Sequence, residues 1–512
     1  MLAPWAQEEM ASAAFEDQRL NARLAKLLSD FGERPQMSIP AACGGHAETI
    51  AAYRFFDNER VGPQQVLEPH FERTLERMSQ QSVALLVQDT TELDLTRPEQ
   101  QVVGAGPLQS ATKRGAFAHP LEVFTEDGTP LGAVWARLWT REDNPVDQTR
   151  KEKQRWRRTA PIEQKESFCW LEGLRAAREA AQRAPQTTCV CIADSEADIY
   201  ELFTEPRGAV PVHWLIRAAQ QDRLLIETPA AADSLGDSPF SRSAEDTAQA
   251  EQVVATRQIR EAALAAPVLF TKPISIRGRR QEISCKTGSR EQPRDSRSAQ
   301  VEVRATTVTL RPPYRAGEPL PAVAVNVVLV REIDPPADDV PVEWLLLTTL
   351  PIDDAEQVRQ IVQYYAVRFM IEVLFRVLKS GCRVEERRFE HIDRLLPCVA
   401  VYLIVAWRTL MVCRLGQSCP DLDCEAVFEP SEWKSVWMAV KRQPPPPTPP
   451  KLGIMIRLVA QLGGYVNRPG RKDPPGPQTV WLGLQRTRDL AWAWTTFGPG
   501  ASTHIATPKD SV

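Results

Sequence analysis

The sequence of 512 residues predicts an α/β protein with a strand-rich middle and helical regions at both ends. Apolar runs of strand length fill the positions from about 80 to 350, whereas helical periodicity dominates before and after them. At 57.4 kDa the chain should contain about three units. We expect a helical domain over residues 1–75, an α/β domain over 76–385 and a mainly helical region over 386–512.

The first region is predicted to contain a cationic helix over residues 17–28. This helix places Arg19, Arg23 and Lys26 on one face and leaves its leucines for packing. Three cations along one helix face suit a track of phosphates. The same pattern is also common on an ordinary solvated helix face, so it is weak by itself.

The second region shows strands and helices in a defined order. The strands VALLVQ, LEVFTED and LGAVWARLW come first, followed by a helix over 170–184 and a strand over 189–192. A short helix follows, and HWLIRAA from His213 supplies a fifth strand. That order is what a ribonuclease-H-like core requires. Alternating strand runs over about 222–350 are expected to form a β-strand insertion that interrupts this core.

Two of these strands end in an aspartate. Asp89 follows the apolar run at 83–87, and Asp194 follows the run at 189–192. Carboxylates at strand ends point into the crevice where open sheets bind their ligands. With Glu372 from a later helix they would form an oxygen-rich site suited to two Mg²⁺ ions, with Mn²⁺ as a substitute. The simpler alternative is that each aspartate forms a turn or caps a helix.

The later helix carries a polar stripe formed by Tyr365, Arg368, Glu372 and Lys379. Their offsets place these side chains within roughly 60° of one another on a helix, opposite an apolar face. Two cations could grip neighbouring phosphates while the carboxylate between them holds an ion. A solvated face of an amphipathic helix would give the same stripe.

Several sequence stretches, in order and over nearly the whole chain, carry a resemblance to a known family. They are YRFFDN at 53–58, QDTTELD around Asp89, ADSEAD around Asp194, WLLLT from Trp344, the helix of the polar stripe and LGGYVNRPGRKDPPGPQTVWLGL near the C-terminus. By these stretches the sequence resembles the D-D-E transposases of bacterial insertion sequences, in the transposon-five branch of the insertion-sequence-four family.

The resemblance implies roles for particular residues. Asp89, Asp194 and Glu372 would be the catalytic, metal-binding triad. The predicted DNA-binding residues are Tyr365, Arg368, Lys379, Trp344, Arg19, Arg23 and Arg217. Among them, Trp344 would stack on a flipped base beside a terminal hairpin. Two positions depart from the family pattern, because Ser195 and Cys169 stand where a basic residue is usual.

The activity implied is cut-and-paste transposition of an insertion sequence by metal-dependent phosphoryl transfer. Its steps are strand nicking, hairpin formation and opening, and strand transfer. The implied partners are double-stranded DNA, as transposon ends and target, and a second copy of the chain, paired through the C-terminal region. Two other classes stay open, a catalytically silent DNA-binding derivative and a metal-dependent phosphoesterase of small substrates.

Composition constrains these three hypotheses about function but does not decide between them. The net charge of −4 and the pI of about 6.0 mean that DNA contacts must come from local basic runs, at 150–158, 277–280 and 467–472. The ten cysteines lack metal-finger spacing, and His119 fits a core or turn position as well as a ligand. The apolar run CVAVYLIVAWRTLMVC is interrupted by Arg408, so we expect a cytoplasmic protein without a membrane span.

Overall fold

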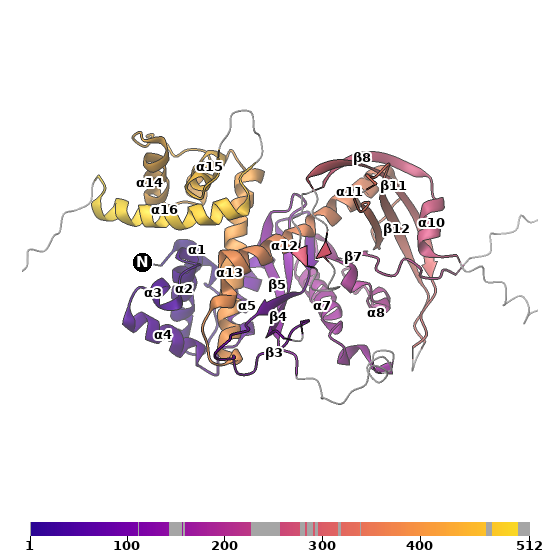
Figure 1. The fold of residues 1–512 in the computed structure, drawn as a ribbon, viewed down its shortest axis with the longest axis horizontal. Helices are drawn as coiled ribbons and strands as arrows, with labels where there is room; N and C mark the ends of the chain where they lie inside the picture. The colour runs from indigo at the N-terminus through magenta and orange to yellow at the C-terminus, as the bar shows by residue number, and fades with distance from the viewer. Residues whose placement is uncertain are drawn as a thin grey trace, which may run out of the picture.

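The computed structural model describes residues 2–110, 112–142, 156, 159–226, 257–276, 282–283, 290–291, 295–315, 319–337, 339–466 and 474–499. Within these ranges the chain forms a mixed α/β fold around one large mixed sheet, with helical regions at one end (Figure 1). The long helix α13 (Ile392–Ser418) stands between the N-terminal helices and the sheet.

The N-terminal region is helical, as predicted. Its helices are α1 (Pro4–Glu9), α2 (Gln18–Glu33), α3 (Ile39–Cys43), α4 (His46–Phe56) and α5 (Pro63–Ser79). The helix expected over 17–28 is confirmed as α2, which begins after Asp17 because that side chain accepts a hydrogen bond from Arg19 N at 2.9 Å.

The strands predicted for the core are confirmed. They are β1 (Val83–Gln88), β4 (Arg114–Phe124), β5 (Pro130–Trp139), β6 (Thr188–Ala193) and β7 (His213–Arg217). The short strands β2 (Thr91–Asp94) and β3 (Gly106–Pro107), which were not predicted, pair with β4. Their central order is β5-β4-β1-β6-β7. Strands β1, β6 and β7 are parallel, and β4 is antiparallel to β1 and β5. Helices α7 (Phe168–Arg183) and α8 (Tyr200–Thr204), with the short 3₁₀ helices η1 (Ile162–Gln164) and η2 (Ser195–Ala197), complete this part.

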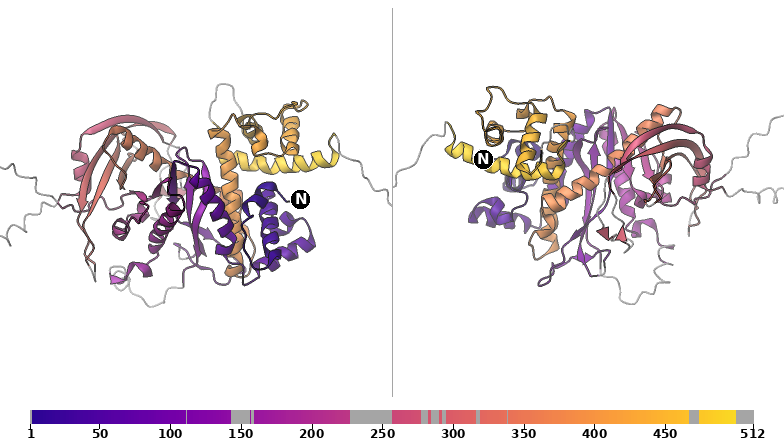
Figure 2. Two further views of the ribbon diagram at one scale, coloured as in Figure 1. Left: turned by 180° about the vertical axis from the view of Figure 1, so that it is seen from behind. Right: turned by 45° about the horizontal axis from the view of Figure 1, so that its top comes forward.

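The strands expected as an insertion extend the same sheet. Helix α10 (Ile259–Ala265) precedes β8 (Val268–Ile276), β11 (Arg297–Leu310), β12 (Val323–Glu332) and β13 (Glu343–Thr348). Strand β13 pairs with β7, so the sheet continues as β7-β13-β12-β11-β8. The short strands β9 (Glu282–Ile283) and β10 (Arg290–Glu291) pair only with each other in the described residues. Both views in Figure 2 show β8, β11 and β12 at the end of the sheet away from the N-terminal helices.

The helix predicted to carry the polar stripe is interrupted. It consists of α11 (Ala355–Val367), α12 (Phe369–Arg376) and a π-helical turn, η3 (Val377–Gly381). At Arg368 the backbone N–H donates to Tyr365 O, three residues earlier instead of four, and this tightens the turn between α11 and α12. The expectation of one regular helix is therefore wrong in this detail.

The C-terminal region is helical. After η4 (Val384–Glu386) and α13 it contains η5 (Cys424–Ala426), α14 (Pro430–Lys441), α15 (Leu452–Leu462) and α16 (Pro477–Phe497). The proline-rich stretch at 443–450 separates α14 from α15, as expected. Among its tryptophans, Trp481 is buried and Trp492 is exposed.

Helix α13 is the one described helix that is long and apolar enough to cross a membrane. In this structure, however, 78% of its most apolar window is buried inside the fold. It packs against α5, α2, β5 and η3. Burial against so many elements explains its composition, because a central core helix is apolar all round.

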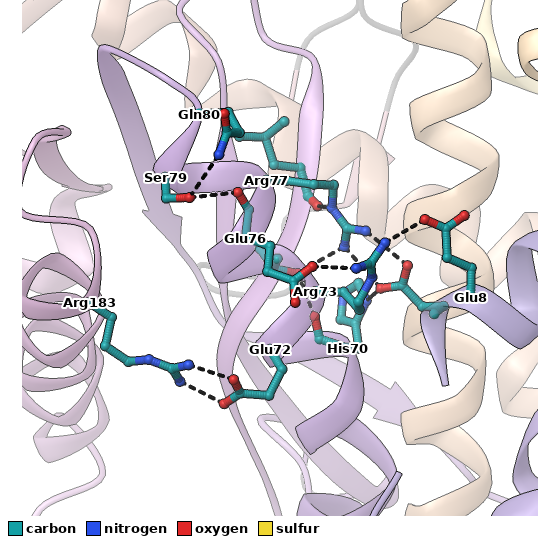
Figure 3. Close-up of polar contacts among 12 residues, drawn as sticks. Glu8, His70, Glu72, Arg73, Glu76, Arg77, Ser79, Gln80 and Arg183 are labelled. Atoms are coloured by element: carbon teal, nitrogen blue, oxygen red, sulfur yellow. Dashed lines mark hydrogen bonds and ion pairs between the residues drawn. The ribbon is translucent and has the colours of Figure 1, made fainter. Parts of the chain in front are cut away.

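Helix α5 fastens the N-terminal helices to the rest of the fold through charged contacts (Figure 3). Arg73 pairs with Glu8 of α1 at 2.5 Å. On the same side, Arg77 holds Glu9 with two hydrogen bonds of 2.9 Å, and His70 Nδ1 lies 2.6 Å from Glu9 Oε1. Burial alone would raise the pKa of Glu9, but His70 and Arg77 bring it down to about 2. Glu9 is therefore a buried carboxylate held by two basic side chains.

A second buried carboxyl group, that of Glu122, is not held by basic side chains in this way. Glu122 of β4 is 2% exposed, and its Oε1 has no hydrogen-bond partner among the described residues. Burial raises the pKa of Glu122 to about 8, although the charge of Arg77 opposes this. The side chain is therefore held in its neutral form near neutral pH.

We expect Glu122→Gln to stabilise the protein at alkaline pH. The native Glu122 keeps a proton that the unfolded chain releases above its ordinary pKa of 4.5, so native stability falls as the pH rises from there towards 8. Glutamine does not titrate, so the free energy of unfolding should rise by about 1–3 kcal/mol at pH 8 and stay unchanged near pH 4.5. Urea unfolding at both pH values measures this. The exposed Glu99→Gln is the control, and an equal response in both variants would contradict the account.

Candidate functional site

Two parallel strands deliver Asp89 and Asp194 to the same edge of the sheet. Val87 of β1 is paired with Ile192 of β6, and each aspartate lies two residues beyond that pair. Neighbouring strands are about 4.8 Å apart, so the two carboxylates leave the sheet side by side. Asp194 also caps η2, because its Oδ1 accepts from Glu196 N at 2.7 Å. The capping role considered for Asp194 is thus real, but it uses one carboxylate oxygen and does not exclude a second role.

Arg368 connects Asp89 with Glu372. Its Nη2 donates to Glu372 Oε1 at 2.7 Å, and its Nη1 lies 3.6 Å from Asp89 Oδ2. The Arg368 side chain is only 8% exposed, whereas the Glu372 side chain is 48% exposed. Tyr365 is also buried, at 1% exposure. The alternative of a solvated helix face is therefore wrong for Arg368 and Tyr365.

The three carboxylates influence one another electrostatically. Burial, together with the charges of Asp194 and Glu372, raises the pKa of Asp89 to about 7, against the opposing effects of Arg368 and Thr90 N–H. Such mutual repulsion is what a bound cation would relieve. In the ranges that the structure covers, no three His, Cys, Asp or Glu side chains are gathered closely enough to hold a metal ion as they stand. Arg368 now supplies the positive charge between Asp89 and Glu372.

The donor chemistry of this site fits Mg²⁺ or Mn²⁺. All three candidate ligands offer carboxylate oxygens, which these hard cations prefer. The nearest basic group, Arg368, is a guanidinium that stays charged and cannot itself be a ligand.

Aromatic and basic side chains from other elements surround the carboxylates. Trp344, at the start of β13, is partly buried and its ring makes an edge-type contact with the Tyr365 ring, with centroids 5.5 Å apart. Burial raises the pKa of Tyr365; Arg368 and Arg217 lower it, and Asp194 adds to the increase. Arg217, at the end of β7, donates from Nη2 to Glu343 O at 3.2 Å. Tyr365, Arg368, Trp344 and Arg217 therefore lie around the triad.

Other predicted DNA-binding residues lie elsewhere. Lys379 lies in η3, the π-helical turn that follows the helix of Glu372, and its Nζ is 3.9 Å from Glu385 Oε1. Arg19 and Arg23 belong to α2, which lies across α13 from the sheet (Figure 1). Arg19 pairs with Asp17, Arg23 pairs with Glu48, and their side chains are 90% and 28% exposed.

The basic runs named from the sequence cannot be placed. The runs at 277–280 and 467–472 lie outside the described residues, as does the run at 150–158 except for its half-exposed Trp156.

A polar network behind Asp89 was not singled out from the sequence. It joins Gln88, Thr90 and His119, which come from β1, the residues after it and β4. The only signal in the sequence is that polar residues flank Asp89 at the end of an otherwise apolar strand. Of the two departures from the family pattern, Cys169 is buried within hydrogen-bonding reach of Thr90, and Ser195 opens η2.

Comparison with known proteins finds two family models in this chain. Residues 2–61 match the model described as Transposase DNA-binding, and residues 404–492 match that of the Transposase Tn5 dimerisation domain. These ranges fall on the N-terminal helices and on the helices from within α13 to α16. A cryo-EM structure of piggyBac transposase in a synaptic complex with hairpin DNA aligns with 99% of this chain and 84% of that chain. Its sequence identity of 8% and TM-score of 0.37 are too low to support an argument.

Proposed function

We propose that this chain is a Tn5-like transposase that cuts and joins DNA at Asp89, Asp194 and Glu372. The matches of residues 2–61 to the Transposase DNA-binding model and of residues 404–492 to the Transposase Tn5 dimerisation domain support this proposal. The observation that carries this proposal is the placement of two aspartates at the ends of parallel strands, beside a glutamate tied to one of them by Arg368. We further assign the protein to the D-D-E type and to the insertion-sequence-four family.

The strand order supports a ribonuclease-H-like core. The order β5-β4-β1-β6-β7, with only β4 antiparallel to the rest, agrees with the order of elements expected from the sequence.

The domain boundaries proposed are residues 1–75, 76–385 and 386–512. DNA and a second copy of the chain are the partners that the two matched domains imply, and a homodimer on transposon ends and target DNA is the specific form we propose. Such an enzyme belongs in the cytoplasm, where the DNA of an insertion sequence lies.

In the proposed mechanism, Asp89, Asp194 and Glu372 would hold the two divalent ions. When bound, Mg²⁺ supplies activation of the attacking hydroxyl and stabilisation of charge on the leaving oxygen. The buried guanidinium of Arg368 lies between Asp89 and Glu372, so its donors would be available to the oxygens of a phosphate bound at these carboxylates. Nicking, hairpin formation, hairpin opening and strand transfer would use this one site in turn.

The aromatic pair beside the triad suits a displaced base. Trp344 is partly exposed, and Tyr365 supports its ring from one edge. A hairpin at the end of a duplex must unstack a base, and stacking on an aromatic side chain recovers about 1–3 kcal/mol of that cost. We therefore propose Trp344 as the stacking residue, with Arg217 and Tyr365 holding its surroundings.

We expect Glu372→Gln to separate DNA cutting from DNA binding. The change removes a ligand charge and keeps size and helix propensity. Mg²⁺-dependent cleavage of a duplex bearing the element's own ends should fall by at least about 100-fold, while the Kd for that duplex stays within about twofold. Asp89→Asn and Asp194→Asn should behave alike. Glu386→Gln, a nearby exposed glutamate, is the matched control and should cut normally.

The same assay distinguishes the other two classes. Tight binding of end DNA without any cleavage by the wild-type protein would indicate a catalytically silent derivative. Hydrolysis of a small phosphate ester without cleavage of DNA would indicate a phosphoesterase. Equal losses of binding and cutting in Glu372→Gln would contradict the site assignment.

For Trp344→Ala we expect a step-specific defect. The first nick needs only the triad and a positioned backbone, so its rate should stay within about threefold, whereas hairpin formation should slow by about tenfold or more. Gel analysis of the products over time measures both steps, and Trp344→Phe, which keeps an aromatic ring, should restore the hairpin. A variant that loses nicking and hairpin formation together and unfolds about 3–5 kcal/mol more easily would show that Trp344 is only a core residue.

A further inference from the structure

Both residues next to Asp89 are tied to one buried histidine. Thr90 Oγ1 lies 2.6 Å from His119 Nδ1, and Gln88 Oε1 lies 3.1 Å from His119 Nε2. His119 belongs to β4 and is fully buried. Its ring packs at right angles against Trp170 at 4.7 Å and edge-on to Trp135 at 5.8 Å. The imidazole therefore has one fixed position directly behind the predicted ligand.

The partners of Gln88 fix which ring nitrogen carries the proton. Gln88 Nε2 donates to Trp170 O at 3.3 Å, and a carbonyl oxygen can only accept, so Gln88 Oε1 must face the histidine. An amide oxygen also only accepts, and His119 Nε2 must therefore carry a hydrogen. Nδ1 of the neutral ring is then bare and accepts from the hydroxyl of Thr90.

The surroundings keep the His119 ring neutral and keep the Gln88 amide in place. Burial, together with the charge of Arg137, lowers the pKa of His119 to about 3, so the ring stays neutral. Helix α7 approaches closely at Gly173, where a Cβ atom would lie 2.1 Å from Gln88 Oε1. The close packing of α7 thus keeps the amide in the orientation that the tautomer requires.

Thr90 connects the His119 network to Asp89. Its backbone N–H donates to Asp89 Oδ1 at 2.7 Å, while Asp89 Oδ2 is the oxygen nearest Arg368. A hydroxyl held by His119 fixes the Thr90 residue, and with it the direction of that N–H. The orientation of the Asp89 carboxylate therefore depends on the contact between Thr90 and His119.

We propose that His119, acting through Thr90, is a positioning residue that orients Asp89 to bind a divalent cation. This inference rests on the proposed function, because it assumes that Asp89 is a metal ligand. Hydrogen-bond partners of ligating carboxylates typically contribute 10–100-fold to metal affinity. His119 itself touches neither the cation nor DNA.

The test is Mn²⁺ affinity of the full chain, measured from the free ion by electron paramagnetic resonance. Thr90→Val keeps the shape of the side chain and removes the hydroxyl, so Mn²⁺ should bind about tenfold or more weakly. Thr90→Ser keeps the hydroxyl and should bind Mn²⁺ like the wild type. Binding of end DNA without metal should be equal in all three proteins.

Thr187→Val is the matched control. Thr187 is a buried threonine just before β6, at the opposite end of that strand from Asp194, and its hydroxyl donates to Gln81 O at 2.9 Å. This substitution should lower thermal stability without changing Mn²⁺ affinity. A wild-type affinity in Thr90→Val, or an equal loss in both valine variants, would overturn the proposal.

Asp89→Asn separates this inference from the proposed function. If Asp89→Asn loses Mn²⁺ and Thr90→Val does not, only the positioning role fails; if Asp89→Asn keeps Mn²⁺, the metal site itself is misassigned.

A second experiment uses the wild-type protein and so does not depend on the folding of any variant. Nitrogen-15 NMR of His119 should show the neutral ring with its proton on Nε2, and a proton on Nδ1 would overturn the proposal.

Discussion

The parallel pairing of β1 and β6 is the constraint on which the candidate site depends. Both strands are buried, and their register brings Asp89 and Asp194 out of the sheet at the same level. A slip of one residue in either strand would turn its aspartate to the other face. The apolar side chains that fix this register also form the two cores on either side of the sheet. The stability of the fold and the geometry of the site therefore have the same origin.

The charges brought together at this edge need compensation, and Arg368 supplies it. A guanidinium that is 8% exposed would be costly without partners, and its contacts with Glu372 and Asp89 offset that cost. The same principle operates between α1 and α5, where Glu9 is held by His70 and Arg77. In the first case the charges surround a proposed reaction site. In the second they join α1 to α5, which packs against β5 of the sheet.

Local patterns in the sequence were enough to predict β1, β6 and α2. An apolar run that ends in a polar residue identifies each strand, and Asp17 marks the start of the helix. The burial of Arg368 could not be predicted, because periodicity orders side chains around a helix without indicating what covers them. The role of His119 depends on partners from β1 and α7, and the extension of the sheet depends on the pairing of β13 with β7. Such contacts arise only when distant segments pack.

The central claim is that Asp89, Asp194 and Glu372 form one metal site for DNA cleavage. The most direct test is anomalous diffraction from crystals of the protein bound to its end DNA and Mn²⁺. The account predicts Mn²⁺ peaks within bonding distance of carboxylate oxygens of all three residues, with Arg368 released from Glu372 towards a phosphate. Peaks that involve none of these carboxylates, or an unchanged contact between Arg368 and Glu372 beside a cleaved strand, would contradict it.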